Sequence, residues 1–216
     1  MPSKPQATPP SLVVGIGASA GGLAAFKTFL ANTPADTGMA FILVQHLDPH
    51  HKSLLVELLG GSAAIPVMVA AHGMAVRKNC VFVIPPDAKL TIKDGILSVV
   101  SPAPPRELRR PIDTFLSSLA EDCGDKAVGI VLSGVGSDGS LGVGKIKEHG
   151  GVTLAQAEFD HVAQGGKGED AARALGAAFK QLGVPVARVT TSQSLADVAS
   201  DELWPIAHQE LARRRP

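Results

Sequence analysis

The sequence has little charge, and the charges that it has cancel. Charged residues make up 19% of the chain, with 20 lysines and arginines against 20 aspartates and glutamates. No long basic block occurs, so nucleic acid and membrane surfaces are not favoured as partners. Long apolar runs are missing too. None approaches the roughly 20 residues of a transmembrane helix, so we expect no segment that spans a bilayer.

Cysteines are scarce as well. Only Cys80 and Cys123 occur, and they lie far apart. They form neither a disulfide framework nor a metal motif, so we expect two small buried residues in a reducing compartment. A signal peptide is also missing: residues 1–10, MPSKPQATPP, contain four prolines and no apolar core, which predicts a disordered tail.

The rest of the composition is typical of an ordinary globular protein. The chain has 216 residues, of which 45% are apolar, and this is enough to bury a full core. The sequence shows no internal repeat and no clear linker. We therefore expect a single domain over residues 11–216.

The stretch from residue 12 to residue 22, LVVGIGASAGG, carries the strongest local signal. Its first residues are apolar and rich in β-branched side chains, which predicts a short buried strand. Small residues follow, and a helix pattern then begins with Leu23, Phe26 and Leu30. Ser19 is thus expected at a sharp strand-to-helix turn, where the free N–H groups of a helix N-terminus stabilise negative charge.

Three explanations fit this stretch. Residues 17–21 match G-x-S-x-G, the nucleophile elbow, and residues 15–20 match G-x-G-x-x-A, a dinucleotide fingerprint. A tight turn that merely needs small residues is the third. A dinucleotide site would need an acidic residue at the end of the second strand, where the sequence has Gln45 and His46. We therefore disfavour the dinucleotide interpretation.

Strands and helices alternate along the rest of the chain. Segments 90–92 and 96–100 flank Asp94-Gly95, which is a hairpin signal. This order implies right-handed crossovers and an α/β fold, a doubly wound, mainly parallel sheet with helices on both faces and one β-hairpin. Further strands are predicted at 40–45, 65–69, 80–84, 127–132, 152–154 and 184–189, and helices at 54–59, 111–120, 141–146, 171–182 and 203–214.

Three polar residues fall at the ends of predicted strands. Ser19 follows the first strand, His46 ends the second, and Asp138 lies in the glycine-rich turn 133–139 after the strand at 127–132. Ligands of parallel sheets bind at the carboxyl ends of the strands. We therefore expect these three side chains on one rim of the sheet.

Serine, histidine and aspartate together can hydrolyse an ester. The histidine removes the serine proton during attack and protonates the leaving group, while the carboxylate orients the imidazole. We expect the backbone N–H groups of Ala20, next to Ser19, and of Val135, in the glycine-rich turn, to bind the oxyanion. Taken singly, His46 fits a structural histidine and Asp138 a cap of the following helix. Their shared rim favours the enzyme, and no residue set has the spacing of a metal site.

Five motifs together make the chain resemble a known family. Over residues 12–156 the chain is similar to the catalytic domain of the CheB-type chemotaxis receptor methylesterases, most closely the form fused to a methyltransferase in hybrid proteins. The motifs are GIGASAGG (15–22), VQHLDP (44–49), FVIPPD (82–87), RRPIDTFLSSLAED (109–122) and AVGIVLSGVGSDGSLG (127–142).

The resemblance implies a fold, a reaction and a set of roles. It implies a three-layer α/β/α sandwich with Ser19 as nucleophile, His46 as base and Asp138 as orienting carboxylate. The reaction would be the hydrolysis of glutamate methyl esters on the helices of a methylated chemoreceptor, with release of methanol, together with deamidation of certain glutamines. The family uses no cofactor, and the resemblance implies a cytoplasmic enzyme.

The chain also departs from the family. His72 stands where an acidic residue is usual, and residues 155–216 diverge and lack the usual Gly-Met-Pro segment. No receiver domain accompanies these residues, so a fused or separate receiver or methyltransferase domain is an expected partner. Two alternatives stay open: a catalytically weakened domain that binds a receptor or another partner, and an esterase outside chemotaxis.

Overall fold

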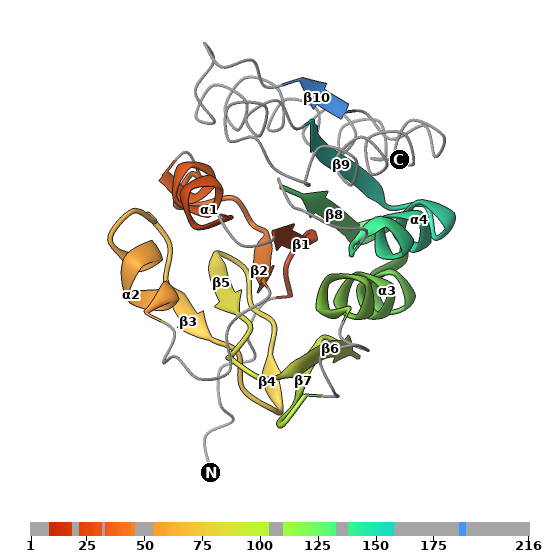
Figure 1. The fold of residues 1–216 in the computed structure, drawn as a ribbon, viewed down its shortest axis with the longest axis horizontal. Coiled ribbons are helices and arrows are strands. Elements are labelled where there is room, and N and C mark those ends of the chain that lie inside the picture. Colours follow the sequence, from red (N-terminus) through yellow and green to blue (C-terminus); the bar gives the residue numbers. More distant parts are fainter. Residues whose placement is uncertain are drawn as a thin grey trace, which may run out of the picture.

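The central element of the fold is a parallel β-sheet (Figure 1). Seven of the described strands form it in the order β10-β9-β8-β1-β2-β5-β3, and every neighbouring pair is parallel. The computed structural model describes residues 9–18, 22–31, 33–45, 54–103, 110–132, 138–157 and 186–188. The strands of this sheet are β1 Val13–Ala18, β2 Ala40–Gln45, β3 Val67–Val69, β5 Cys80–Val83, β8 Ala127–Val131, β9 Val152–Ala157 and β10 Val186–Arg188.

Helices cover both faces of the sheet (Figure 1). α1 (Gly22–Ala31) and α2 (Leu55–Gly60) lie on one face, and α3 (Pro111–Cys123) and α4 (Ser140–Glu148) lie on the other. A short 3-10 helix, Gly124–Lys126, follows α3. The predicted α/β sandwich with a mainly parallel sheet is therefore confirmed.

β1 and β2 each contribute to two separate apolar cores. Val13 of β1 belongs to the core under α3 and α4, whereas Val14 and Ile16 belong to the core under α1 and α2. In β2, Ile42 and Phe41 divide between the two cores in the same way. Because both faces are buried, these strands appear in the sequence as continuous apolar runs rather than as alternating ones.

A second, antiparallel sheet packs beside α3. Its order is β4-β7-β6, with β4 at Met74–Ala75, β6 at Lys89–Lys93 and β7 at Ile96–Val100. The predicted hairpin joins β6 to β7, and both of its turn residues have positive φ, 52° at Asp94 and 69° at Gly95. Two positive φ values are those of a type I′ turn, for which Asp-Gly is favoured.

The predicted segments agree with the structure wherever it describes them. The strand at 40–45 has the predicted bounds, β9 is longer than the predicted 152–154, and β10 covers part of the predicted 184–189. The helices predicted at 171–182 and 203–214 lie outside the described residues. None of the described helices has the length and apolar character needed to cross a membrane.

Glycines in β1 let α3 lie directly on the sheet. A Cβ atom on Gly17 would be 2.4 Å from Cγ2 of Ile112, and one on Gly15 would be 2.7 Å from Cδ2 of Leu116. Real Cβ atoms do not approach other atoms this closely, so the packing distance requires glycine at both positions. The first turn of α3 is thereby held over the carboxyl end of β1.

Candidate active site

The carboxyl ends of three neighbouring strands, β8, β1 and β2, define the candidate site. Ala18, the last residue of β1, pairs with Gln45, the last residue of β2. Gly17 pairs with Val131 of β8, and the N–H of Leu132 donates to the carbonyl of Gly17 at 2.8 Å. The three strands therefore end at one edge, in register, as the sequence predicts.

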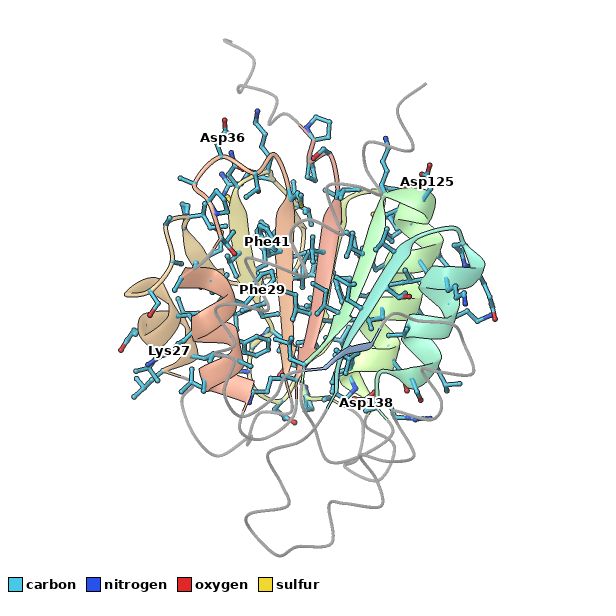
Figure 2. The ribbon with its side chains drawn as sticks, turned by 90° about the horizontal axis from the view of Figure 1, so that it is seen from above. Lys27, Phe29, Asp36, Phe41, Asp125 and Asp138 are labelled. Atoms are coloured by element: carbon cyan, nitrogen blue, oxygen red, sulfur yellow. The ribbon has the colours of Figure 1, made fainter. Side chains whose placement is uncertain are left out.

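Asp138 is the one predicted site residue whose side chain the structure describes. Figure 2 shows it at the opposite end of the sheet from Asp36 and Asp125, which precede β2 and β8 in the chain. Asp138 thus lies at the carboxyl edge, where it was expected. Ser19, His46 and the expected oxyanion donors Ala20 and Val135 lie outside the described residues, so their positions stay predictions.

The carboxylate of Asp138 caps a helix other than its own. The N–H of Ile112 donates to Oδ2 at 3.1 Å, and the N–H of Asp113 donates to Oδ1 at 2.9 Å. Both donors belong to the first turn of α3, whose partial positive charge favours the ionised carboxylate. The simpler expectation, a cap of the following helix, is wrong, because the N-cap residue of α4 is Gly139.

Asp113, which the sequence analysis did not single out, faces the opposite way. It is 6% exposed, and its Oδ1 accepts the N–H groups of Gly139 at 2.9 Å and Gly142 at 2.8 Å. Nε of Arg110 lies 3.0 Å from its Oδ2, near enough to offset the charge but without hydrogen-bond alignment. Arg110 is therefore half-buried in an ion pair.

Each of the two carboxylates caps the helix that belongs to the other one. The N-cap residue of α3 is Arg110 and that of α4 is Gly139, and neither gives a side-chain cap. Asp138, from the α4 side, supplies the cap of α3, and Asp113, from α3, supplies the cap of α4. Each carboxylate thus satisfies N–H groups that helices leave without an internal partner.

The turn that joins Asp138 to α4 has no room for another residue type. Gly139 has a φ of +104°, and a Cβ there would be 3.0 Å from Cγ2 of Val131. A Cβ on Gly142 would be 2.5 Å from Cβ of Leu116. α3 and α4 therefore approach closely at this point, which lets a short aspartate side chain reach across.

The other candidate groups take no part in this edge. At the C-terminal end of α4, Nδ1 of His149 donates to the carbonyl of Lys145 at 2.9 Å, a position where the helix dipole favours a positive charge. Nδ1 of His72 lies 3.5 Å from Oγ of Ser98. Burial, reinforced by the negative charge of Asp122, raises the pKa of the Cys123 thiol to about 12.

Metal ligation finds no support in the described part of the chain. Among residues 9–18, 22–31, 33–45, 54–103, 110–132, 138–157 and 186–188, no three His, Cys, Asp or Glu side chains come together as a metal site. The remaining histidines, at positions 46, 50, 51, 161 and 208, lie outside those residues. The chemistry that the described edge offers is that of an oriented carboxylate.

Comparison with known proteins gives a consistent family. A family model described as CheB methylesterase matches residues 14–184. The chain is 36% identical over 179 residues to protein-glutamate methylesterase/protein-glutamine glutaminase 2 of Cupriavidus metallidurans, covering 82% of this chain and 52% of that protein. A second relative of the same description, from Cupriavidus pinatubonensis, is 35% identical, covering 80% of this chain and 50% of its own length.

The fold has a solved counterpart. The structure matches the crystal structure of the Thermotoga maritima CheB methylesterase catalytic domain with a TM-score of 0.72 at 22% identity, covering 91% of this chain and 98% of that one. At this identity the likeness concerns the fold. The chain spans about half the length of the two Cupriavidus relatives.

Proposed function

The chain belongs to the CheB methylesterase family, and we propose that it is a serine hydrolase acting on glutamate methyl esters. The substrate would be a methylated chemoreceptor, whose cytoplasmic signalling helices carry the esters, and the products would be a glutamate carboxylate and methanol. The two Cupriavidus relatives are also named protein-glutamine glutaminases, which supports deamidation of glutamine by the same site.

The proposed reaction has two stages. Oγ of Ser19 attacks the ester carbonyl while His46 removes its proton, and His46 then gives that proton to the departing methoxide. Water, deprotonated by His46, attacks the resulting acyl-enzyme and releases Ser19 with the new carboxylate. The N–H groups of Ala20 and Val135 would stabilise the tetrahedral oxyanion at both stages. Each such donor typically lowers the activation barrier by about 3–4 kcal/mol.

Asp138 supplies the third role, orientation of the imidazole. Its two described hydrogen bonds, from the N–H groups of Ile112 and Asp113, use one position on each carboxylate oxygen. A carboxylate accepts roughly four hydrogen bonds, so a bond from the imidazole of His46 is compatible with both. The positive end of α3 keeps the carboxylate charged, which is the form that stabilises an imidazolium.

One observation carries this assignment: Asp138 lies at the strand edge from which Ser19 and His46 depart. Ala18 and Gln45 pair at the ends of β1 and β2, and each is followed directly by one of the predicted residues. Consecutive Cα atoms are only about 3.8 Å apart. We therefore expect the nucleophile and the base on neighbouring strand ends, beside the turn that carries the aspartate.

Methanol release from a methylated receptor fragment tests the proposal. We expect Ser19→Ala and His46→Ala each to lower the rate by at least about a thousandfold, because the triad acts as a unit. A fluorophosphonate probe should label wild-type protein at Ser19, and the label should be lost in His46→Ala. Ser11→Ala is the matched control, since this serine precedes β1 at the other end of the strand, and its activity should be unchanged.

The same experiment separates the alternatives. A folded wild-type protein that binds the receptor fragment but neither labels nor releases methanol would be the binding domain rather than the enzyme. Labelling at Ser19 with turnover of small methyl esters only would indicate an esterase outside chemotaxis. Regulation by a fused or separate receiver or methyltransferase domain is part of the same proposal, because the relatives are about twice as long as this chain.

A further inference from the structure

Asp113 and the turn of Asp138 hold each other through backbone groups. The N–H of Asp113 donates to Oδ1 of Asp138 at 2.9 Å, while Oδ1 of Asp113 accepts the N–H of Gly139, the next residue after Asp138, at 2.9 Å. The N–H of Gly142 adds a third bond, again to Oδ1 of Asp113, at 2.8 Å. A displacement of either side therefore strains bonds that fix the other.

The donors in this arrangement have little freedom to adjust. All of them are main-chain N–H groups at the start of a helix, so their directions are set by the helices and not by side-chain rotamers. Asp113 is 6% exposed. If its carboxylate lost one of these hydrogen bonds, water could not readily replace the lost partner, and the loss would cost free energy. Gly139, at φ +104°, packs so closely that an added Cβ would lie 3.0 Å from Val131 and 3.1 Å from Ile112.

We propose that Asp113 is a positioning residue of the active site, whose buried carboxylate fixes the turn that presents Asp138 to the catalytic histidine. The inference rests on the proposed function, because it assumes that Asp138 orients His46. Asp113 would not touch the substrate. Its effect on the reaction would pass through the Asp138–Gly139 turn, and its own charge would matter less than the place of its oxygen.

The far end of α3 provides a matched comparison. Asp122 also accepts two main-chain N–H groups of a turn, those of Asp94 and Gly95 in the β6–β7 hairpin. Both aspartates thus hold a turn with positive φ to the same helix, but only one of the two turns carries a proposed catalytic residue. Loss of either aspartate would loosen the packing of α3, so Asp122 serves as the control for that general effect.

Three substitutions at position 113 separate position from charge. In Asp113→Asn the amide carbonyl can still accept both N–H groups, so we expect kcat to stay within about threefold of wild type. Asp113→Glu keeps the charge but moves the oxygen by a methylene, and a misplacement of about 1 Å costs up to roughly a hundredfold. We therefore expect kcat to fall in the order Asn, Glu, Ala, with Asp113→Ala at least about tenfold below Asn.

The measurements are methanol release from the methylated receptor fragment, for kcat and KM, and the rate of fluorophosphonate labelling at Ser19. All are made well below the melting temperature of every variant. We expect kcat and the labelling rate to fall together while KM stays within about twofold, because substrate binding is not changed. Asp122→Ala should lower the melting temperature yet keep both rates near wild type.

Two results would overturn the proposal. One is a Glu variant at least as active as the Asn variant, which would show that the place of the carboxylate oxygen does not control the reaction. The other is an Asp113→Ala protein as active as Asp122→Ala. If Asp113→Ala does not fold, the order of Asn and Glu decides alone. Failure of the proposed function looks different, because wild-type protein would then show no labelling that depends on Ser19.

Discussion

The two faces of the central sheet are packed by different means. Under α1 the contacts are between large apolar side chains: Phe29 and Phe41 meet edge to face with ring centroids 5.8 Å apart and an interplanar angle of 67°, and Figure 2 shows both rings in the interior. Under α3, in contrast, β1 has Gly15 and Gly17, and the helix packs almost directly on the main chain of the strand.

The difference matters for where a site can be built. A face packed by large side chains holds the two backbones apart by the size of those side chains. Close approach at glycine also occurs between the two helices of the α3 face, where α3 and α4 meet at Gly142 and come within reach of a single aspartate side chain, that of Asp113. Catalytic geometry needs precision, and the proposed site lies on the glycine side.

Removal of volume on the α1 face should have the largest effect of the changes considered. Phe41 is fully buried, so Phe41→Ala would lose the transfer free energy of the ring and leave a cavity, which lowers the free energy of unfolding by about 3–5 kcal/mol. Urea denaturation followed by circular dichroism measures this, with Phe41→Leu as the smaller-cavity control. A loss under about 1 kcal/mol would show that this face collapses to fill the space, and the contrast between faces would then be wrong.

Addition of volume should be harmful on the α3 face alone. Gly142→Ala places a Cβ 2.5 Å from Cβ of Leu116 and 3.2 Å from Cα of Asp113, so we expect a loss of about 1–3 kcal/mol. Helix propensity by itself would predict a gain. Gly60→Ala in α2 is the matched control, since nothing lies within 4 Å of its Cβ position, and it should gain up to about 1 kcal/mol. Equal effects at both positions would contradict the comparison.

The sequence was sufficient to predict the architecture because its signals are local. Apolar runs of strand length, a helix that starts at Pro111 and the Asp94-Gly95 turn each depend on a few neighbouring residues, and the structure has an element at each. β4 was not predicted because Met74–Ala75 is too short to show any periodicity. The rule that parallel strands present their ligands at one edge then placed Asp138 correctly.

The role of Asp113 could not be predicted, for a physical reason. An aspartate in the first turn of a helix ordinarily serves that helix through its dipole. The N–H groups that Asp113 accepts come from residues 26 and 29 positions later in the chain, and nothing in the local pattern indicates them. The alternative explanation of Asp138 as a cap of α4 failed likewise, because the helix that it caps is distant in sequence.

The glycines of β1 show how one pattern can have two causes. Gly15 and Gly17 begin the stretch that matches a dinucleotide fingerprint, yet both lie within the strand. Their requirement for glycine comes from Leu116 and Ile112 of α3, which occupy the space of a side chain. Close packing of helix on strand is one of the reasons for glycine in true dinucleotide sites as well, so the packing of α3 is sufficient to explain both glycines.

The smallest expected effect concerns Cys123, at the end of α3 remote from Asp113. Burial and the charge of Asp122 raise the pKa of its thiol to about 12, against about 8.5 in an unfolded chain. The folded state thus holds this proton more tightly. The resulting stabilisation is complete below the unfolded pKa and is lost as the pH rises through the folded pKa.

Cys123→Ala removes that dependence, so the difference in unfolding free energy between wild type and variant should shrink between pH 8 and pH 10.5. Urea denaturation at several pH values measures it, and the sequence contains no tyrosine to add an ionisation in this range. Cys80 is present in both proteins, so its ionisation cancels in the difference between the two unfolding free energies. Parallel curves would mean that the C-terminal end of α3 admits water freely, and that its close packing is confined to the first turns, where Asp113 and Asp138 meet.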